Sequence, residues 1–185
     1  TIGFKSVTMD QIANAMGISK KTIYNSFENK TELVKEVTSY MFNNITTGIT
    51  EIKKTSNNPI SEIYDINLFL IKYLKNESVS PLYQLEKYYP LIHKEINKKQ
   101  FDFITKSTTL SLKNGIKLGL FRKDIQIDFI SRLYFKGMIG IRDLDTFPTK
   151  LYTPAKLKID FIEYHLRAIV TEKGLKQLNH FIKKN

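Results

Sequence analysis

The sequence contains no cysteine. This absence excludes disulfide bonds, thiolate metal sites and cysteine nucleophiles, and it fits a reducing compartment such as the cytoplasm. The sequence also lacks an uncharged apolar run of the roughly 20 residues that a membrane-spanning helix needs. Its apolar stretches soon meet charged residues such as Lys72 and Arg142. We therefore expect a soluble, cytoplasmic protein that does not enter a membrane.

Histidine is scarce as well, and recognisable catalytic motifs are missing. The three histidines, His93, His165 and His180, have neither a partner at helical spacing nor an acidic motif beside them, so a metal site is not expected. No nucleophile elbow of the form Gly-x-Ser-x-Gly occurs, and no acid, base or nucleophile stands at a spacing typical of an active site. We expect neither an enzyme nor a bound cofactor.

Glycine and proline are sparse, with 8 and 5 copies in 185 residues, and the apolar residues recur every three or four positions. This pattern predicts an all-α chain with short connections. The clearest helix runs from about 29 to 54, because its apolar residues follow a helical repeat from Leu33 to Ile52. Further helices are expected between 59 and 76, over 81–89, from 90 to about 115–119, over 128–141, and from 154 onward. Gly174 is expected to end or bend this last helix.

The formal net charge of +11 suggests a nucleic-acid partner, but its distribution is uneven. Residues 1–45 hold five lysines and four acidic residues, so nearly all of the excess lies in residues 46–185. Total charge therefore does not locate a DNA-binding site. Only the local group of Lys20, Lys21 and Lys30 could do so.

Residues 8–33 contain the pattern of a helix-turn-helix. Thr8 and Gln11 form a capping box at the start of a short helix, and Gly17 supplies the positive φ that ends it. Ser19 then caps a second helix. The small Ala13 permits the two helices to cross closely, so the spacing predicts a helix-turn-helix.

The second helix of this motif has one apolar and one polar face. Ile23 and Phe27 lie four residues apart and are expected to face inward. The remaining surface offers cations, hydroxyls, an amide and a phenol, from Lys20, Lys21, Thr22, Tyr24 and Asn25. Lysines and hydroxyls can hold phosphates, while lysine and asparagine can read guanine and adenine in the major groove.

The runs 8–13 and 17–27, followed by Lys30 and Leu33 and preceded by the pair Gly3 and Phe4, closely resemble the DNA-binding head of TetR-type repressors. The resemblance implies a head over 1–45 and a helical ligand-binding and dimerisation body over 46–185. It also implies a homodimeric, ligand-responsive transcription regulator, namely a repressor that a small apolar effector releases from its operator. The dimer would form through the last two long helices, at about 128–141 and 155–170.

Residue roles follow from the same resemblance. Lys20, Lys21 and Asn25 would face bases, and the phosphates would be held by Thr8, Thr22, Tyr24 and Lys30. Ser19 stays open, because it serves either as a cap alone or as a cap that also contacts phosphate. The first helix of the family's head is nearly absent from this sequence, so we expect it to lie largely upstream of Thr1.

Two further interpretations stay open at this stage. The body holds aromatic and methionine residues at helical spacing, and these form either ordinary core or a pocket for an apolar effector. They are Phe69, Tyr73, Tyr83, Tyr88, Tyr89, Phe103, Phe135 and Met138. The alternative function is a basic helical module that binds a membrane surface or a protein partner through residues such as Lys98, Lys99, Lys183 and Lys184.

Overall fold

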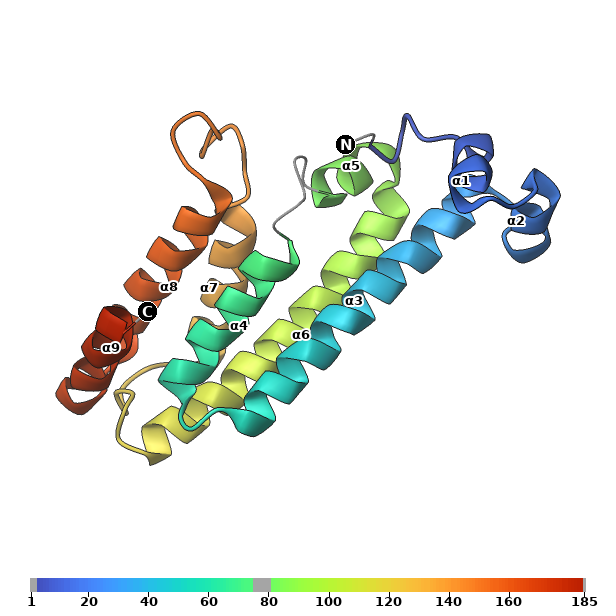
Figure 1. Cartoon of the computed structure of the whole chain (residues 1–185). Helices are drawn as coiled ribbons and strands as arrows, with labels where there is room; N and C mark the ends of the chain where they lie inside the picture. The colour runs from blue at the N-terminus through green and yellow to red at the C-terminus, as the bar shows by residue number, and fades with distance from the viewer. Residues whose placement is uncertain (1–2, 75–80, 185) are drawn as a thin grey trace. The chain divides into compact units, whose positions relative to one another are not determined.

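Within residues 3–74 and 81–184, which the computed structural model describes, the chain forms nine α-helices and no strand beyond one isolated bridge (Figure 1). The prediction of an all-α chain is therefore confirmed. None of these helices is both long and apolar enough to cross a membrane. The helices are α1 Met9–Met16, α2 Lys20–Ser26, α3 Lys30–Thr55, α4 Pro59–Tyr73, α5 Pro81–Tyr88, α6 Pro90–Lys117, α7 Ile127–Gly140, α8 Pro154–Ile169 and α9 Glu172–Lys184.

Helix starts follow local signals in the sequence. Pro59 and Pro154 occupy the first turns of α4 and α8, where proline's missing N–H costs nothing. Asn58 and Thr153 precede them and cap these two helices with side-chain oxygens. The predicted fading of the second body helix over 76–80 lies outside the described residues, as do Thr1 and Ile2.

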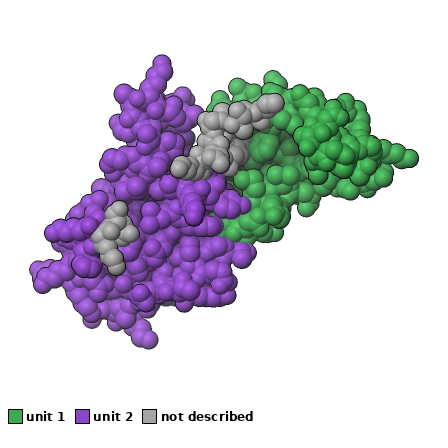
Figure 2. Space-filling view, in the orientation of Figure 1, with its two compact units in different colours: residues 1–46, 76–99 green, residues 47–75, 100–185 purple. Residues whose placement is uncertain are grey.

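The chain divides into two compact units (Figure 2). Unit 1 comprises residues 1–46 and 76–99, and unit 2 comprises residues 47–75 and 100–185. Helices α3 and α6 each contribute residues to both units. The division near residue 46 lies close to the predicted boundary, and unit 1 takes in α5 as well. The assignment of 1–45 and 46–185 as functional domains stays a prediction.

Unit 1 has two small apolar clusters. In the first, Met9 and Ala13 of α1 pack against Ile23 of α2. In the second, Val34 of α3 packs against Leu85 of α5, and two isoleucines of α6 complete the cluster. Phe4 packs against this second cluster, so apolar contact attaches the segment before α1 to it.

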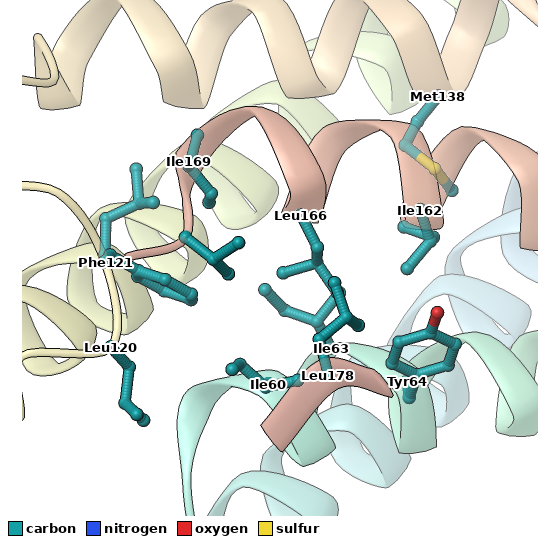
Figure 3. Close-up of a cluster of buried hydrophobic side chains, with 12 residues drawn as sticks. Ile60, Ile63, Tyr64, Leu120, Phe121, Met138, Ile162, Leu166, Ile169 and Leu178 are labelled. Atoms are coloured by element: carbon teal, nitrogen blue, oxygen red, sulfur yellow. The ribbon is translucent and has the colours of Figure 1, made fainter. Parts of the chain in front are cut away.

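Unit 2 holds the larger core, in which α4, α6, α7, α8 and α9 all take part (Figure 3). Several of its side chains are fully buried, including Leu112, Phe121, Ile162 and Leu166. Gly115 of α6 makes room for one of them, because a Cβ there would lie 2.0 Å from the Phe121 ring. Unit 2 can therefore bury a sizeable core without disulfides or metal.

The prediction that one long helix continues from 154 to Gly174 is wrong, because α8 ends at Ile169 and α9 begins at Glu172. Val170 between them is extended and forms the isolated bridge with Phe121. The Thr171 hydroxyl donates to the Gly119 carbonyl over 2.7 Å and accepts from the Gly174 N–H over 3.1 Å. Gly174 lies inside the first turn of α9, where a Cβ would meet the Leu120 carbonyl oxygen at 2.1 Å.

A half-buried ion pair joins three helices of unit 2. The Lys53 ammonium of α3 lies 2.7 Å from the Glu62 carboxylate of α4 and donates to the Ser111 hydroxyl of α6 over 2.8 Å. The same ammonium donates to the Ser107 carbonyl over 3.2 Å. Glu62 also accepts from Ser111, so both charges are hydrogen-bonded. Such full pairing is what allows charged groups to be buried.

Two glycines let large rings approach a helix backbone in unit 2. A Cβ at Gly48 of α3 would lie 2.4 Å from the Phe69 ring of α4. A Cβ at Gly137 of α7 would lie 2.3 Å from the Phe161 ring of α8. Each pair of helices therefore packs more closely than any larger residue would allow at these positions.

Candidate nucleic-acid interface

Local caps hold both ends of α1. The Thr8 hydroxyl accepts from the Gln11 N–H over 3.2 Å, and the Thr8 N–H donates to the Gln11 side chain over 2.8 Å. At the other end of α1, Gly17 adopts φ 67°, and the Ile18 N–H donates to the Ala13 carbonyl over 3.0 Å. The predicted capping box and glycine stop are both confirmed.

Ser19 caps α2 through its hydroxyl, which accepts from the Thr22 N–H over 3.1 Å and lies 2.8 Å from the Thr22 hydroxyl. Ile23 is buried, and Phe27 packs beside it as the sequence predicts. The inner face of α2 is thus attached to α1, while the caps hold its first turn. Both hydroxyls stay exposed, so capping does not prevent a phosphate contact.

Several of the residues predicted to contact DNA lie on the outer surface of α2. Lys21, Thr22 and Asn25 are exposed on this helix of the helix-turn-helix. Tyr24, on the same helix, is 43% exposed. This face therefore presents a cation, a hydroxyl and an amide, which are groups that can hydrogen-bond to phosphates and base edges.

Lys20 differs from its neighbours because it has an internal partner that sequence reasoning missed. Its ammonium lies 2.9 Å from the Asp10 carboxylate of α1 and 5.9 Å from the centre of the Tyr24 ring. The hydrogen bond to Asp10, together with its negative charge, raises the pKa of Lys20. The two residues lie ten positions apart on different helices, so no periodicity within one helix indicates the pair.

Lys30 also makes a contact within unit 1. Its ammonium donates to the Lys5 carbonyl over 3.0 Å, so it links the start of α3 to the segment before α1. The Lys5 ammonium in turn lies 5.0 Å from the centre of the Tyr88 ring on α5, and Lys87 lies 5.7 Å from the same ring. This basic and aromatic surface was not predicted, because it depends on the packing of α5 within unit 1.

The eight candidate effector residues fall into both units. Phe69, Tyr73, Phe103, Phe135 and Met138 belong to unit 2, whereas Tyr83, Tyr88 and Tyr89 belong to unit 1. Phe135 and Met138 are buried, while Tyr73, Tyr83 and Tyr88 are exposed by more than a third. Among the described residues, no group of three or more His, Asp or Glu side chains is placed to hold a metal ion.

The N-terminal residues of the chain match a known protein family. Residues 1–37 match the family described as bacterial regulatory proteins, tetR family. This segment contains α1, the turn and α2, so the resemblance seen in the sequence is confirmed over the helix-turn-helix. None of the curated proteins matches the chain.

Solved structures share the fold along almost the whole chain. A transcriptional regulator from Cytophaga hutchinsonii is 14% identical, with a TM-score of 0.73 over 91% of each chain. A TetR-family regulator from Agrobacterium tumefaciens is 16% identical, with a TM-score of 0.70 over 91% of this chain and 90% of that one. A second TetR-family regulator from Cytophaga hutchinsonii is 16% identical, with a TM-score of 0.70 over 93% and 88%. At these identities the likeness establishes the fold.

Proposed function

We propose that this chain is a TetR-type, ligand-responsive transcription regulator that represses by binding operator DNA and is released by a small apolar effector. The observation that carries the proposal is the exposed polar face of α2, which stands within the matched residues 1–37. In this proposal Lys20, Lys21 and Asn25 read bases, and the phosphates are held by Thr8, Thr22, Tyr24 and Lys30. Ser19 caps α2 and lies at the same surface.

The regulated DNA is identified by selection from a genomic fragment pool. The purified protein is mixed with the fragments at physiological salt, and the retained DNA is sequenced. We expect a common sequence with twofold symmetry, because a symmetric pair of heads reads two half-sites. Retention without any shared sequence would contradict the proposal.

Lys21→Ala and Asn25→Ala are each expected to weaken operator binding by about 1–3 kcal/mol and to relax base preference at one position. Tyr24→Phe and Lys30→Ala should instead weaken binding to all sequences. Titrations against operators with single base changes measure these differences. Lys54→Ala serves as the control, since Lys54 is an exposed lysine of unit 2 paired with Glu51.

The salt dependence separates phosphate contacts from base contacts. Loss of the Lys30 contact should lower the slope of log affinity against log salt by about 1. Because Lys30 also donates to the Lys5 carbonyl, thermal melts of this variant must accompany the titrations. If both the slope and the affinity were unchanged in this variant, Lys30 would not contact DNA.

The proposed homodimer forms through α7 and α8. Phe129 and Leu133 lie one turn apart on α7 and are 62% and 51% exposed. On α8, the Phe161 ring packs on Gly137 of α7. Tyr164 lies one turn further along α8 and is 74% exposed. Exposed apolar side chains on both helices favour a protein contact there. A second head would supply the base contacts that the two-turn helix α2 lacks.

The effector is proposed to act through α3. The Phe69 ring of α4 packs on α3 at Gly48. The same helix begins at Lys30 and contains Val34, which belongs to an apolar cluster of unit 1. A molecule that displaces Phe69 and its neighbour Tyr73 would press on α3 and tilt it. In a dimer that tilt alters the separation of the two heads, which DNA with fixed groove spacing penalises.

Coupling between effector and operator is expected to be reciprocal, at about 1–3 kcal/mol or roughly 5- to 150-fold. Compounds are first screened for thermal stabilisation of the free protein. Each hit is then titrated with and without saturating operator. We expect weaker compound binding in the presence of operator, by the same factor as the compound weakens operator binding. Equal compound affinity in both states would contradict the allosteric mechanism.

The alternative function, a basic membrane-surface or partner-binding module, is not favoured. It accounts for the charge of residues 46–185 but not for the helix-turn-helix match. Flotation with anionic liposomes, run beside a DNA shift at physiological salt, distinguishes the two. Flotation without DNA binding would favour the alternative.

A further inference from the structure

Unit 1 holds a group of cations and aromatic rings outside the helix-turn-helix. The Lys5 ammonium lies 5.0 Å from the centre of the Tyr88 ring, and the Lys87 ammonium lies 5.7 Å from the same centre. Lys87 also lies 6.0 Å from the centre of the Tyr83 ring. All four side chains are exposed, and three of them belong to α5. We call these four residues the α5 surface.

Two contacts attach the α5 surface to the helix-turn-helix segment. Phe4, next to Lys5, packs against the apolar cluster that Leu85 of α5 shares with α3 and α6. The Lys30 ammonium donates to the Lys5 main-chain carbonyl over 3.0 Å. Lys5 also stands only three residues before Thr8, the cap of α1. The α5 surface therefore adjoins Thr8 and Lys30, the two phosphate contacts proposed outside α2.

The charge of the α5 surface is not balanced by carboxylates. Within the described part of the chain, neither Lys5 nor Lys87 forms an ion pair, although other lysines of unit 1 do so over 2.9, 3.7 and 2.8 Å, namely Lys20, Lys35 and Lys99. Glu86 precedes Lys87, but consecutive residues of a helix do not face each other. Like charges held close together repel, and a bound anion would remove this repulsion.

The tyrosine rings suit these lysines to phosphate. A ring attracts an ammonium group through its electron-rich face, yet it uses none of the group's three N–H donors and leaves its charge in place. Lys30 likewise keeps two donors beyond its bond to the Lys5 carbonyl. Such cations meet phosphate oxygens as point charges and carry no sequence information. The surface therefore offers affinity for a phosphate backbone and not base recognition.

We propose that the α5 surface binds phosphates of operator DNA beside those that Thr8 and Lys30 hold. Lys5 and Lys87 supply the charge, and the Tyr88 ring positions both ammonium groups. Phosphates of one strand follow each other about every 3.4 Å along the DNA axis, so neighbouring cations can meet successive phosphates. This inference rests on the proposed function, since it adds contacts to the same complex.

A double variant with Lys5→Ala and Lys87→Ala should lower the slope of log affinity against log salt by about 2. The advantage of the wild type over this variant should therefore fall about tenfold between about 50 and 200 mM salt. Base preference should not change. The control combines Lys94→Ala with Lys98→Ala, which removes the same charge from exposed positions of α6 in unit 1. A double variant with the slope of the wild type would overturn the inference.

Ethylation of single phosphates of the operator locates the contacts. We expect the double variant to become insensitive to phosphates whose ethylation weakens binding by the wild type and by the control. These phosphates should adjoin those to which Lys30→Ala becomes insensitive. If the double variant and the wild type gave the same interference pattern, the α5 surface would not contact DNA.

The role of the ring is tested at one position. Tyr88→Leu removes the ring face and should weaken operator binding about two- to fivefold, as expected for an exposed cation–π contact. Tyr88→Phe keeps the face and should bind as the wild type does. Both variants are compared at a temperature at which thermal melts show them to be folded. Equal affinities of the two variants would contradict the positioning role of Tyr88.

The same titrations separate this inference from the proposed function. Specific binding by the wild type, with no change in the double variant, would reject the α5 surface alone. A wild type that binds no specific sequence would reject both. Flotation with anionic liposomes is measured in parallel. If the double variant lost flotation but bound operator as the wild type does, the surface would serve a membrane and the inference would be wrong.

Discussion

Leu133→Asp is expected to leave the chain folded but monomeric, and to weaken operator binding by about 10²- to 10⁴-fold. Leu133 is 51% exposed on α7, so a carboxylate there is tolerated in a single chain. In the proposed dimer the same carboxylate would be buried against a partner's apolar surface, at a high desolvation cost. The factor is the avidity lost when two linked heads become independent.

Sedimentation and operator titration check this result. Leu110→Asp is a matched control, because Leu110 is 54% exposed and lies on α6, outside the proposed contact. It should remain dimeric and bind operator as the wild type does. A wild type that stays monomeric at micromolar concentration with operator present would refute the dimer. A Leu133→Asp variant that stays dimeric would place the contact elsewhere.

Lys53→Met is expected to lower the free energy of unfolding by about 3–5 kcal/mol, because it leaves the Glu62 carboxylate buried without its cation. The side chain of Glu62 is only 10% exposed, and that of Lys53 is 21% exposed. The adjacent Lys54 also lies 2.7 Å from a carboxylate, that of Glu51, but both side chains are more than 60% exposed. Lys54→Met should therefore cost less than about 1 kcal/mol.

Urea unfolding at one fixed protein concentration compares the two variants, since dimerisation would make stability depend on concentration. Adding Glu62→Leu to Lys53→Met should restore much of the loss, because the unpaired charge is then removed. Equal destabilisation by Lys53→Met and Lys54→Met would mean that water screens the Lys53 pair as well as it screens the surface pair.

The helix-turn-helix could be predicted from the sequence because its signals are local. The capping box of Thr8 and Gln11 acts over three residues, and the left-handed Gly17 ends α1 by its own conformation. The inward positions of Ile23 and Phe27 follow from helical repeat alone. Each of these features depends on neighbours within one turn or one helix.

Features that depend on packing between distant segments were not predicted. The break after Ile169 results from the bridge between Val170 and Phe121, while the apolar repeat continues through it toward Leu178. Residue type and helical spacing do not show which aromatic side chains share one core, and the eight candidate effector residues fall into two units because α5 belongs to unit 1.

The pairing of Lys20 with Asp10 bears on how much Lys20 would contribute to DNA affinity in the proposed complex. A lysine that meets phosphate normally releases cations from DNA, and this release favours binding to any sequence. Lys20 already holds a carboxylate of its own chain, so exchanging that partner for phosphate releases less. Asp10 would also repel the phosphates of any DNA that lies against this surface. In the proposed complex Lys20 would therefore add less to DNA affinity and to its salt dependence than a lysine without an internal partner.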